Sequence, residues 1–126
     1  MLVFSIIFLY QITLSSIVRI WDISPDKLCR KHLLGEHREL HAIWSILVNH
    51  KKGYSKHPET LRWKGKLKAL YLRHYNLTQE MIKRGYQHKS PLESSFAVGV
   101  SFQDDFVDTI EYQKKLLRSK KCKCKV

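Results

Sequence analysis

Glu39 is the acidic residue whose surroundings best suit chemistry, because it follows Arg38 and lies seven positions after His32. Seven residues are close to two turns of a helix, so His32 and Glu39 should share one face. An apolar stripe on one side of Glu39 should raise the pKa of its carboxyl by partial burial, while Arg38 and His32 should lower it. Glu39 is therefore the candidate for a carboxylate that works together with a nucleophile.

The chain itself can supply that nucleophile. An extended segment from Val18 to Ser24 spans roughly 20 Å, and a helix from Pro25 to Glu39 spans about 21 Å. If the chain doubles back at Ser24-Pro25, residue 18 arrives beside Glu39. An α-amino group there, with a pKa of about 8 against about 10.4 for lysine, is a few hundred times more often uncharged at neutral pH. Such an amine and a carboxylate are suited to Schiff-base chemistry.

Simpler interpretations compete with these. A glutamate beside a histidine on an amphipathic helix is usually a solvated pair. His74 falls in the apolar stripe of a second helix, where a hydrogen-bonded core histidine is commoner than a ligand. In His37-x-Glu39-x-His41 the glutamate is one place away from the zinc-protease pattern, so a zinc hydrolase is disfavoured.

Composition limits the class of protein. The 126 residues are enough for one small domain, and 44% hydrophobic residues exclude a disordered basic tail. The net charge of +12 favours a polyanionic partner, with nucleic acid first and an acidic membrane surface second. Five glycines and three prolines exclude collagen-like and low-complexity classes.

The three cysteines do not form a disulfide framework and indicate a reducing compartment. Cys122 and Cys124 make a C-x-C pair in the Lys-rich end of the chain, after Cys29 near its start. Two thiolates fall short of the four ligands of a usual metal site. We therefore expect free thiols on a solvated basic tail and no metal bound by them.

The hydrophobic periodicity predicts an all-α fold, a compact single domain of three main helices with long loops. Ser24-Pro25 should start a helix that runs to about Asn49. A second should run from Pro58 to Arg84, ended by Gly85. A motif resembling a capping box, from Asp108 to Glu111, should start a third helix that ends near Ser119. Residues 50–57 and 86–105 are expected to be loops.

The first 17 residues do not fit this domain. They contain no charged side chain, yet the apolar run is short and diluted for a membrane span and lacks the basic start of a signal peptide. A third interpretation, which we favour, is that translation starts at Val18 and that the working domain is 18–126. We therefore expect a cytoplasmic, nucleoid-associated protein, with membrane anchoring by 1–17 disfavoured.

Two segments carry a family resemblance. The run RIWDISPDKLCRKHLLGEHREL, residues 19–40, resembles the N-terminus of pyrimidine-dimer DNA glycosylases of the phage endonuclease V type and their prokaryotic relatives. The run KLKALYLRHYNLTQEMIKRGY, residues 66–86, is similar to that family's second helix. With the C-terminal helix, the resemblance covers most of 18–126, and the spacing of Arg19, His32 and Arg38-Glu39 matches throughout.

The resemblance implies a mainly helical DNA-repair enzyme that uses no cofactor, acts as a monomer without an obligate protein partner, and flips a nucleotide from damaged double-stranded DNA. The N-terminal amine, here at Val18, attacks C1′, the base leaves, a Schiff base forms, and β-elimination cuts the strand. Glu39 matches the catalytic glutamate that supports the cationic sugar. Arg38 and His32 match residues that line the site, and Arg19 matches a phosphate and base-opening contact.

Two departures bear on substrate choice. Ala42 replaces a basic residue of the DNA face, and KKCKCKV replaces the aromatic tail of the phage enzyme. Lys31, on the basic strip beside Glu39, is expected to contact DNA, as are Lys114 and Arg118, which lie four residues apart on the third helix. The preferred lesion, another base lesion or an abasic site included, stays open.

Three hypotheses follow. The first is a DNA glycosylase with abasic-site lyase activity. The second is a non-catalytic basic DNA-binding module, which explains the charge and the helices but leaves Arg38-Glu39 without a role. The third is a small membrane-anchored protein, which depends on residues 1–17 alone.

Overall fold

The structure is a computed structural model that describes residues 19–53, 55–88 and 90–126. Val18 and the apolar residues 1–17, for which the sequence raised three interpretations, lie outside the described residues. The predicted all-α class is confirmed, since the described residues form helices and no strand beyond one isolated bridge. The elements are η1 (Pro25–Lys27), α2 (Arg30–Val48), α3 (Pro58–Leu61), α4 (Leu67–Lys83), η2 (Ser94–Phe96) and α5 (Ile110–Ser119).

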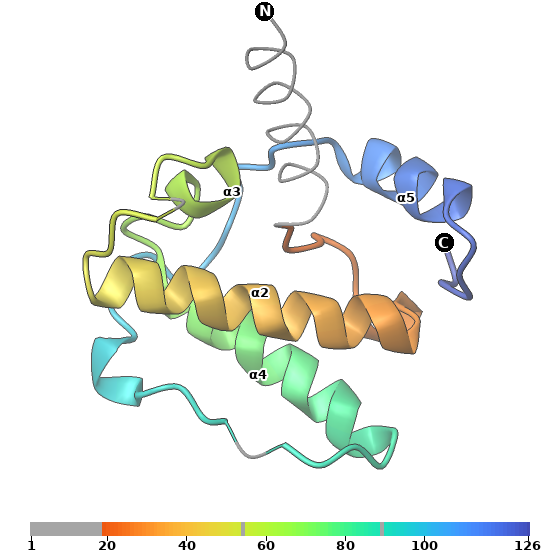
Figure 1. The fold of residues 1–126 in the computed structure, drawn as a ribbon, viewed down its shortest axis with the longest axis horizontal. Coiled ribbons are helices and arrows are strands. Elements are labelled where there is room, and N and C mark those ends of the chain that lie inside the picture. Colours follow the sequence, from red (N-terminus) through yellow and green to blue (C-terminus); the bar gives the residue numbers. More distant parts are fainter. Residues whose placement is uncertain (1–18, 54, 89) are drawn as a thin grey trace, which may run out of the picture.

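Helices α2 and α4 form the centre of the molecule. In Figure 1, α4 lies beneath α2, while α3 and α5 lie above it. The predicted apolar stripes face each other in the core, with Leu33, Leu40 and Ile43 on α2 and Leu70 and Leu77 on α4 fully buried. The core also includes Trp44 and Trp63, as predicted. None of the helices in the described residues has the length and apolarity that crossing a membrane requires.

The prediction of the first helix is wrong about the residue at which the helix begins. Instead of one helix from Pro25, the chain makes the short η1, becomes extended at Leu28 and Cys29, and only then enters α2 at Arg30. The break buries the Leu28 side chain in the core. Arg84, at the end of α4, satisfies the carbonyl groups that the break leaves free, because its guanidinium donates to Pro25 O at 3.2 Å and Leu28 O at 2.6 Å.

The second predicted helix, 58–84, is two helices. The chain turns between α3 and α4, where Gly65 has a φ of +76°, a value that glycine adopts without strain. Gly99, at φ +88°, lies against this turn so closely that an added Cβ would be 2.3 Å from Gly65 O. The segment around Gly99 then caps α4, because Lys68 N and Ala69 N donate to Val98 O and Val100 O at 2.8 and 3.1 Å.

The third helix and the chain end also differ from expectation. The N-cap of α5 is Thr109 and not Asp108, since its side chain accepts a hydrogen bond from Tyr112 N. The tail after α5 is not a freely solvated chain. It returns to the start of α2, where Lys125 N donates to Lys27 O at 2.7 Å, and Cys124 and Val126 pack against the core.

Candidate active site

A pocket of about 540 Å³ opens where the segment before η1, the first half of α2 and the chain end meet. The structure brings together five of the residues singled out from the sequence, which all line this pocket: Arg19, Lys31, His32, Arg38 and Glu39. Val18 lies outside the described residues. The remaining two candidates, Lys114 and Arg118, lie on α5 and do not line the pocket, and their contact with DNA stays a prediction.

Glu39 lies on the wall of the pocket and is partly buried. Burial raises the pKa of its carboxyl, and the charge of neighbouring Arg38 partly offsets that increase. Both effects agree in direction with the expectation from the sequence. A carboxyl group in this setting can hold or release a proton and can stabilise a nearby positive charge.

His32 lies beside Glu39 on the same wall but is not positively charged at neutral pH. Burial, followed by the charges of Lys120 and Lys31, lowers its pKa. Its Nδ1 atom faces the thiols of Cys29 and Cys124, at 3.1 and 3.3 Å. The sequence led us to expect that the charge of His32 lowers the pKa of Glu39, and the structure does not support this part of the expectation. The two sulfur atoms orient the His32 ring.

Arg19 reaches the pocket from the segment before η1. Its guanidinium pairs with Asp108 at 2.8 Å and lies 5.0 Å from the centroid of the Trp21 ring. These two contacts hold the Arg19 guanidinium in place. They also occupy part of the arginine, so a DNA phosphate would have to compete with Asp108 for it.

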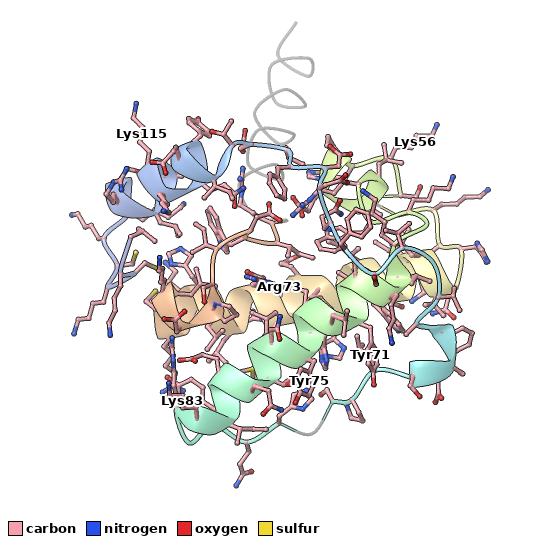
Figure 2. The ribbon with its side chains drawn as sticks, turned by 180° about the vertical axis from the view of Figure 1, so that it is seen from behind. Lys56, Tyr71, Arg73, Tyr75, Lys83 and Lys115 are labelled. Atoms are coloured by element: carbon pink, nitrogen blue, oxygen red, sulfur yellow. The ribbon has the colours of Figure 1, made fainter. Side chains whose placement is uncertain are left out.

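The floor of the pocket contains an acidic residue that the sequence did not single out. Glu36 is fully buried and forms a two-bond ion pair with Arg73 of α4, at 2.7 and 2.9 Å. It also accepts a hydrogen bond from Trp21 N at 3.0 Å. In Figure 2, Arg73 lies between α4 and α2. Burial raises the pKa of Glu36, and Arg73 opposes that increase, so this carboxylate joins three parts of the chain.

Two further side chains hold the segment before η1 in place. Arg62 donates to Ile20 O at 2.9 Å and to Asp22 Oδ1 at 3.0 Å. Gln113 of α5 accepts from Asp22 N at 2.8 Å and donates to Asp22 Oδ2 at 3.0 Å. The backbone that leads to Val18 is therefore bonded to α2, to the turn after α3 and to α5.

Sequence reasoning missed the contribution of the chain end. Lys120, Lys121 and Cys122 line the pocket opposite α2. Their density of positive charge was visible in the sequence, but nothing local in the sequence indicates that the tail folds back. With Lys31 and Arg38, these lysines make the pocket strongly basic.

Two clusters of residues of the types that bind metals lie near α2. One contains Cys29, His32, Cys122 and Cys124, whose donor atoms all lie within 4.8 Å of one another. The cysteines are free thiols and not disulfides.

The second cluster contains four histidines, again with donor atoms within 4.8 Å: His37, His41, His74 and His88. His74 is buried and its Nε2 lies 3.1 Å from His41 Nε2, in agreement with the prediction of a hydrogen-bonded core histidine. Burial lowers the pKa of His37 to about 4 and that of His74 to about 3. Since two residues of helix turn by about 200°, His37 and His41 lie on the opposite side of α2 from Glu39.

Comparison with known proteins agrees with the resemblance. The sequence profile described as pyrimidine dimer DNA glycosylase matches residues 18–94, which include α2, α4 and most of the pocket. This chain belongs to the pyrimidine dimer DNA glycosylase family. At the family level, its activity is that of a DNA-repair glycosylase whose substrate is DNA damaged by pyrimidine dimers. No curated protein and no solved structure matches the chain.

The Glu36–Arg73 pair should be essential for the stability of this glycosylase-family domain. Replacing Arg73 with methionine leaves the Glu36 carboxylate buried without its partner, which costs about 3–5 kcal/mol of unfolding free energy. Urea unfolding followed by circular dichroism measures this change. Lys114→Met is the matched control, since it removes a 3.8 Å contact with exposed Glu111 and should change stability by less than about 0.5 kcal/mol. Equal stability of the two variants would contradict the assignment.

Proposed function

We propose that the protein is a DNA glycosylase with abasic-site lyase activity, and that its nucleophile is an α-amino group at Val18. The observation that supports this most strongly is that Arg19 and Glu39 line one pocket. Because Val18 directly precedes Arg19 in the sequence, we propose that its α-nitrogen meets the Glu39 carboxyl in this pocket. The match to the glycosylase family also begins at residue 18.

The proposed reaction starts with attack of the uncharged amine on C1′ of the damaged nucleotide. The bond between C1′ and the base breaks, and the base leaves with the electron pair. Opening of the sugar then gives a Schiff base, and loss of a proton from the neighbouring carbon allows β-elimination of the phosphate. Partly buried Glu39 stabilises the positive charge on the sugar and exchanges protons with the reacting groups.

The basic walls of the pocket supply the affinity for DNA. Lys31 and Arg38 lie on one wall, and Lys120 and Lys121 on the other, so DNA phosphates meet positive charge from both sides. Such contacts are independent of sequence and weaken with salt. The damaged nucleotide must leave the stack to reach Glu39, which costs a few kcal/mol and least at a damaged pair. We expect Lys114 and Arg118 of α5 to contact DNA phosphates outside the pocket.

Glu39→Gln should separate catalysis from binding. The amide keeps the size of the side chain but cannot exchange protons or carry negative charge, so we expect strand cleavage of dimer-containing duplex DNA to fall by about 10²- to 10⁴-fold. DNA affinity, measured by fluorescence anisotropy at fixed salt, should change by less than about threefold, since the substitution removes no cation.

Glu111→Gln is the control for the loss of one negative charge, because Glu111 is exposed on α5 and lies outside the pocket. It should cleave like the unmodified protein. If neither Glu39→Gln nor the starting protein cleaves damaged DNA while both bind it, the alternative of a non-catalytic DNA-binding module is correct.

The identity of the nucleophile can be tested with borohydride, which reduces a Schiff base to a stable protein–DNA bond. Protein that begins at Val18 should form this adduct on abasic-site DNA, and peptide mapping should find the DNA on the α-nitrogen. Protein that retains residues 1–17 has an amide nitrogen at position 18, so we expect its yield of adduct at that position to be zero.

Lys31→Met in the protein that begins at Val18 is the companion variant, because Lys31 is the lysine of the first half of α2 that lines the pocket. At protein concentrations that saturate the DNA, its adduct yield should persist, because the loss of a phosphate contact then has no effect on the amount bound. An adduct that maps to Lys31, or that forms equally well on the extended protein, would replace the α-amine by a lysine as the nucleophile.

A further inference from the structure

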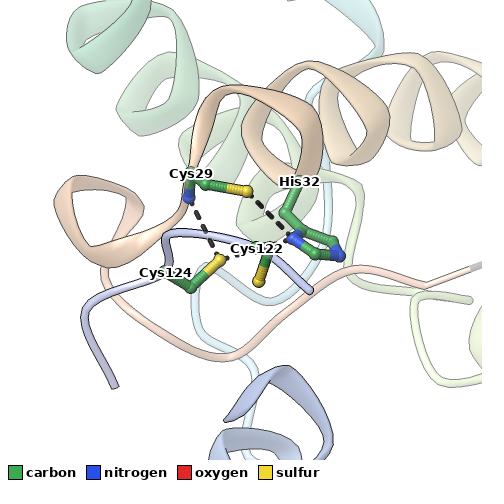
Figure 3. A group of neighbouring side chains, drawn as sticks. All are labelled: Cys29, His32, Cys122 and Cys124. Carbon is green, nitrogen blue, oxygen red and sulfur yellow. Dashed lines mark hydrogen bonds between the residues drawn. The ribbon is translucent and has the colours of Figure 1, made fainter. Parts of the chain in front are cut away.

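The cluster formed by Cys29, His32, Cys122 and Cys124 joins the two ends of the described chain beside the pocket (Figure 3). Cys29 is the last residue before α2, and His32 lies in its first turn. Cys122 and Cys124 come from the tail. The sequence alone suggested too few ligands at the C-x-C pair, because the other two donors lie about 90 positions earlier in the chain.

We propose that these three cysteines and His32 bind one zinc ion. Three thiolates and one imidazole form one of the common donor sets of structural zinc sites. The His32 ring presents Nδ1 to the sulfur atoms of Cys29 and Cys124, at 3.1 and 3.3 Å. With Zn–S bonds of about 2.3 Å and Zn–N bonds of about 2.0 Å, a tetrahedral site needs S–N separations of about 3.5 Å. The sulfur and nitrogen atoms need to move apart only slightly to admit the ion.

The surroundings of this cluster favour the charge of such a site. Three thiolates and Zn²⁺ carry a net charge of −1, and Lys31 and Lys120 lie near enough to act on the charge of His32. Positive neighbours stabilise thiolates and lower the cost of removing their protons. Lys121, Lys123 and Lys125 alternate with the two tail cysteines along the sequence.

Zinc binding would stabilise the packing of the tail against the start of α2. Among the described residues, the hydrogen bonds that tie residues 120–126 to the start of α2 include the bond from Lys125 N to Lys27 O and that from Cys29 N to Cys124 Sγ at 3.1 Å. Metal binding free energy can replace a missing hydrophobic core in small elements. The ion would fix one wall of the pocket, Lys120 and Lys121 included, and hold the ring of His32 through Nδ1.

The test uses the full chain, freed of metal with a chelator and then titrated with Co²⁺. A thiolate-to-cobalt charge-transfer band should saturate at one equivalent per chain and disappear when Zn²⁺ is added. Zinc should also protect all three thiols of the unmodified protein from alkylation and slow trypsin cleavage at the tail lysines. These last two measurements need no variant and are independent of DNA cleavage.

Cys124→Ser should lose the band, and Lys123→Ser, which keeps every donor, should retain it. Circular dichroism establishes that both variants remain folded. The proposal is wrong if no thiolate band forms, if zinc leaves the thiols equally reactive, or if mass spectrometry of protein kept under reducing conditions finds a disulfide in place of the metal.

The four-histidine cluster supports a second metal site by a separate observation. His37 and His88 each have a buried Nε2 atom with no hydrogen-bond partner, and the Nε2 atoms of His41 and His74 are only 3.1 Å apart. Buried polar atoms without partners are costly and rare. One cation placed between the four ring nitrogens, which all lie within 4.8 Å of one another, would give each of them a partner.

From this geometry we infer a site for a divalent transition metal that prefers imidazole ligands, such as Zn²⁺ or Ni²⁺. The site would tie α2 to α4 and to the loop that contains His88. It lies on the other side of α2 from Glu39, so its contribution would be to the stability of the helix pair and not to the reaction.

This site can be separated from the cysteine site by variants. Unmodified protein should bind two equivalents of Zn²⁺, and His88→Asn should bind one while keeping the thiolate-to-cobalt band. His50→Asn is the control, because His50 is exposed and its φ of +52° suits asparagine. Two results would overturn the second site. One is that the unmodified protein binds one equivalent of Zn²⁺ and Cys124→Ser binds none. The other is that His88→Asn binds as much Zn²⁺ as the unmodified protein.

Discussion

The position of the segment Arg19–Ile23 is the constraint on which the pocket depends. Ile20, Trp21 and Ile23 are buried in the core, so this short stretch must satisfy its backbone groups with side chains, because it belongs to no helix or sheet. Glu36, Arg62 and Gln113 supply those partners. Since these three residues lie on or beside different helices, the segment fixes their relative positions as much as they fix its own.

The same arrangement gives two glutamates of one helix different surroundings. Glu36 points into the protein, and its charge is cancelled by Arg73 at 2.7 Å. Glu39, three residues later, lines the pocket and has no such bidentate partner among the described residues, and burial raises the pKa of its carboxyl. Because Glu36 is neutralised locally, the field in the pocket is set by the lysines, Arg38 and Glu39. A buried structural pair thus lies one helical turn away from a carboxyl group that lines the pocket.

Sequence periodicity could predict what a single helix determines. The buried face with Leu33, Leu40 and Ile43, and the shared face of His32 and Glu39, follow from 3.6 residues per turn. Features that depend on partners far along the chain could not be predicted. The break before α2 needs Arg84 as a cap, the burial of Glu36 needs Arg73, and the pocket wall formed by Lys120 and Lys121 needs the tail to fold back.

The tail is basic and packs beside a basic pocket, so its positive charges and those of the pocket should repel each other. Lys120 and Lys121 lie across the pocket from Lys31 and Arg38, and at low salt such like charges destabilise one another. Something must offset that repulsion, and the described contacts of the tail include only a few hydrogen bonds and the packing of Cys124 and Val126. Thiolates around a zinc ion would supply both negative charge and binding energy at this point. Lys120 and Lys121 would then be held in position to contact DNA. Bound DNA would neutralise the positive charge that remains.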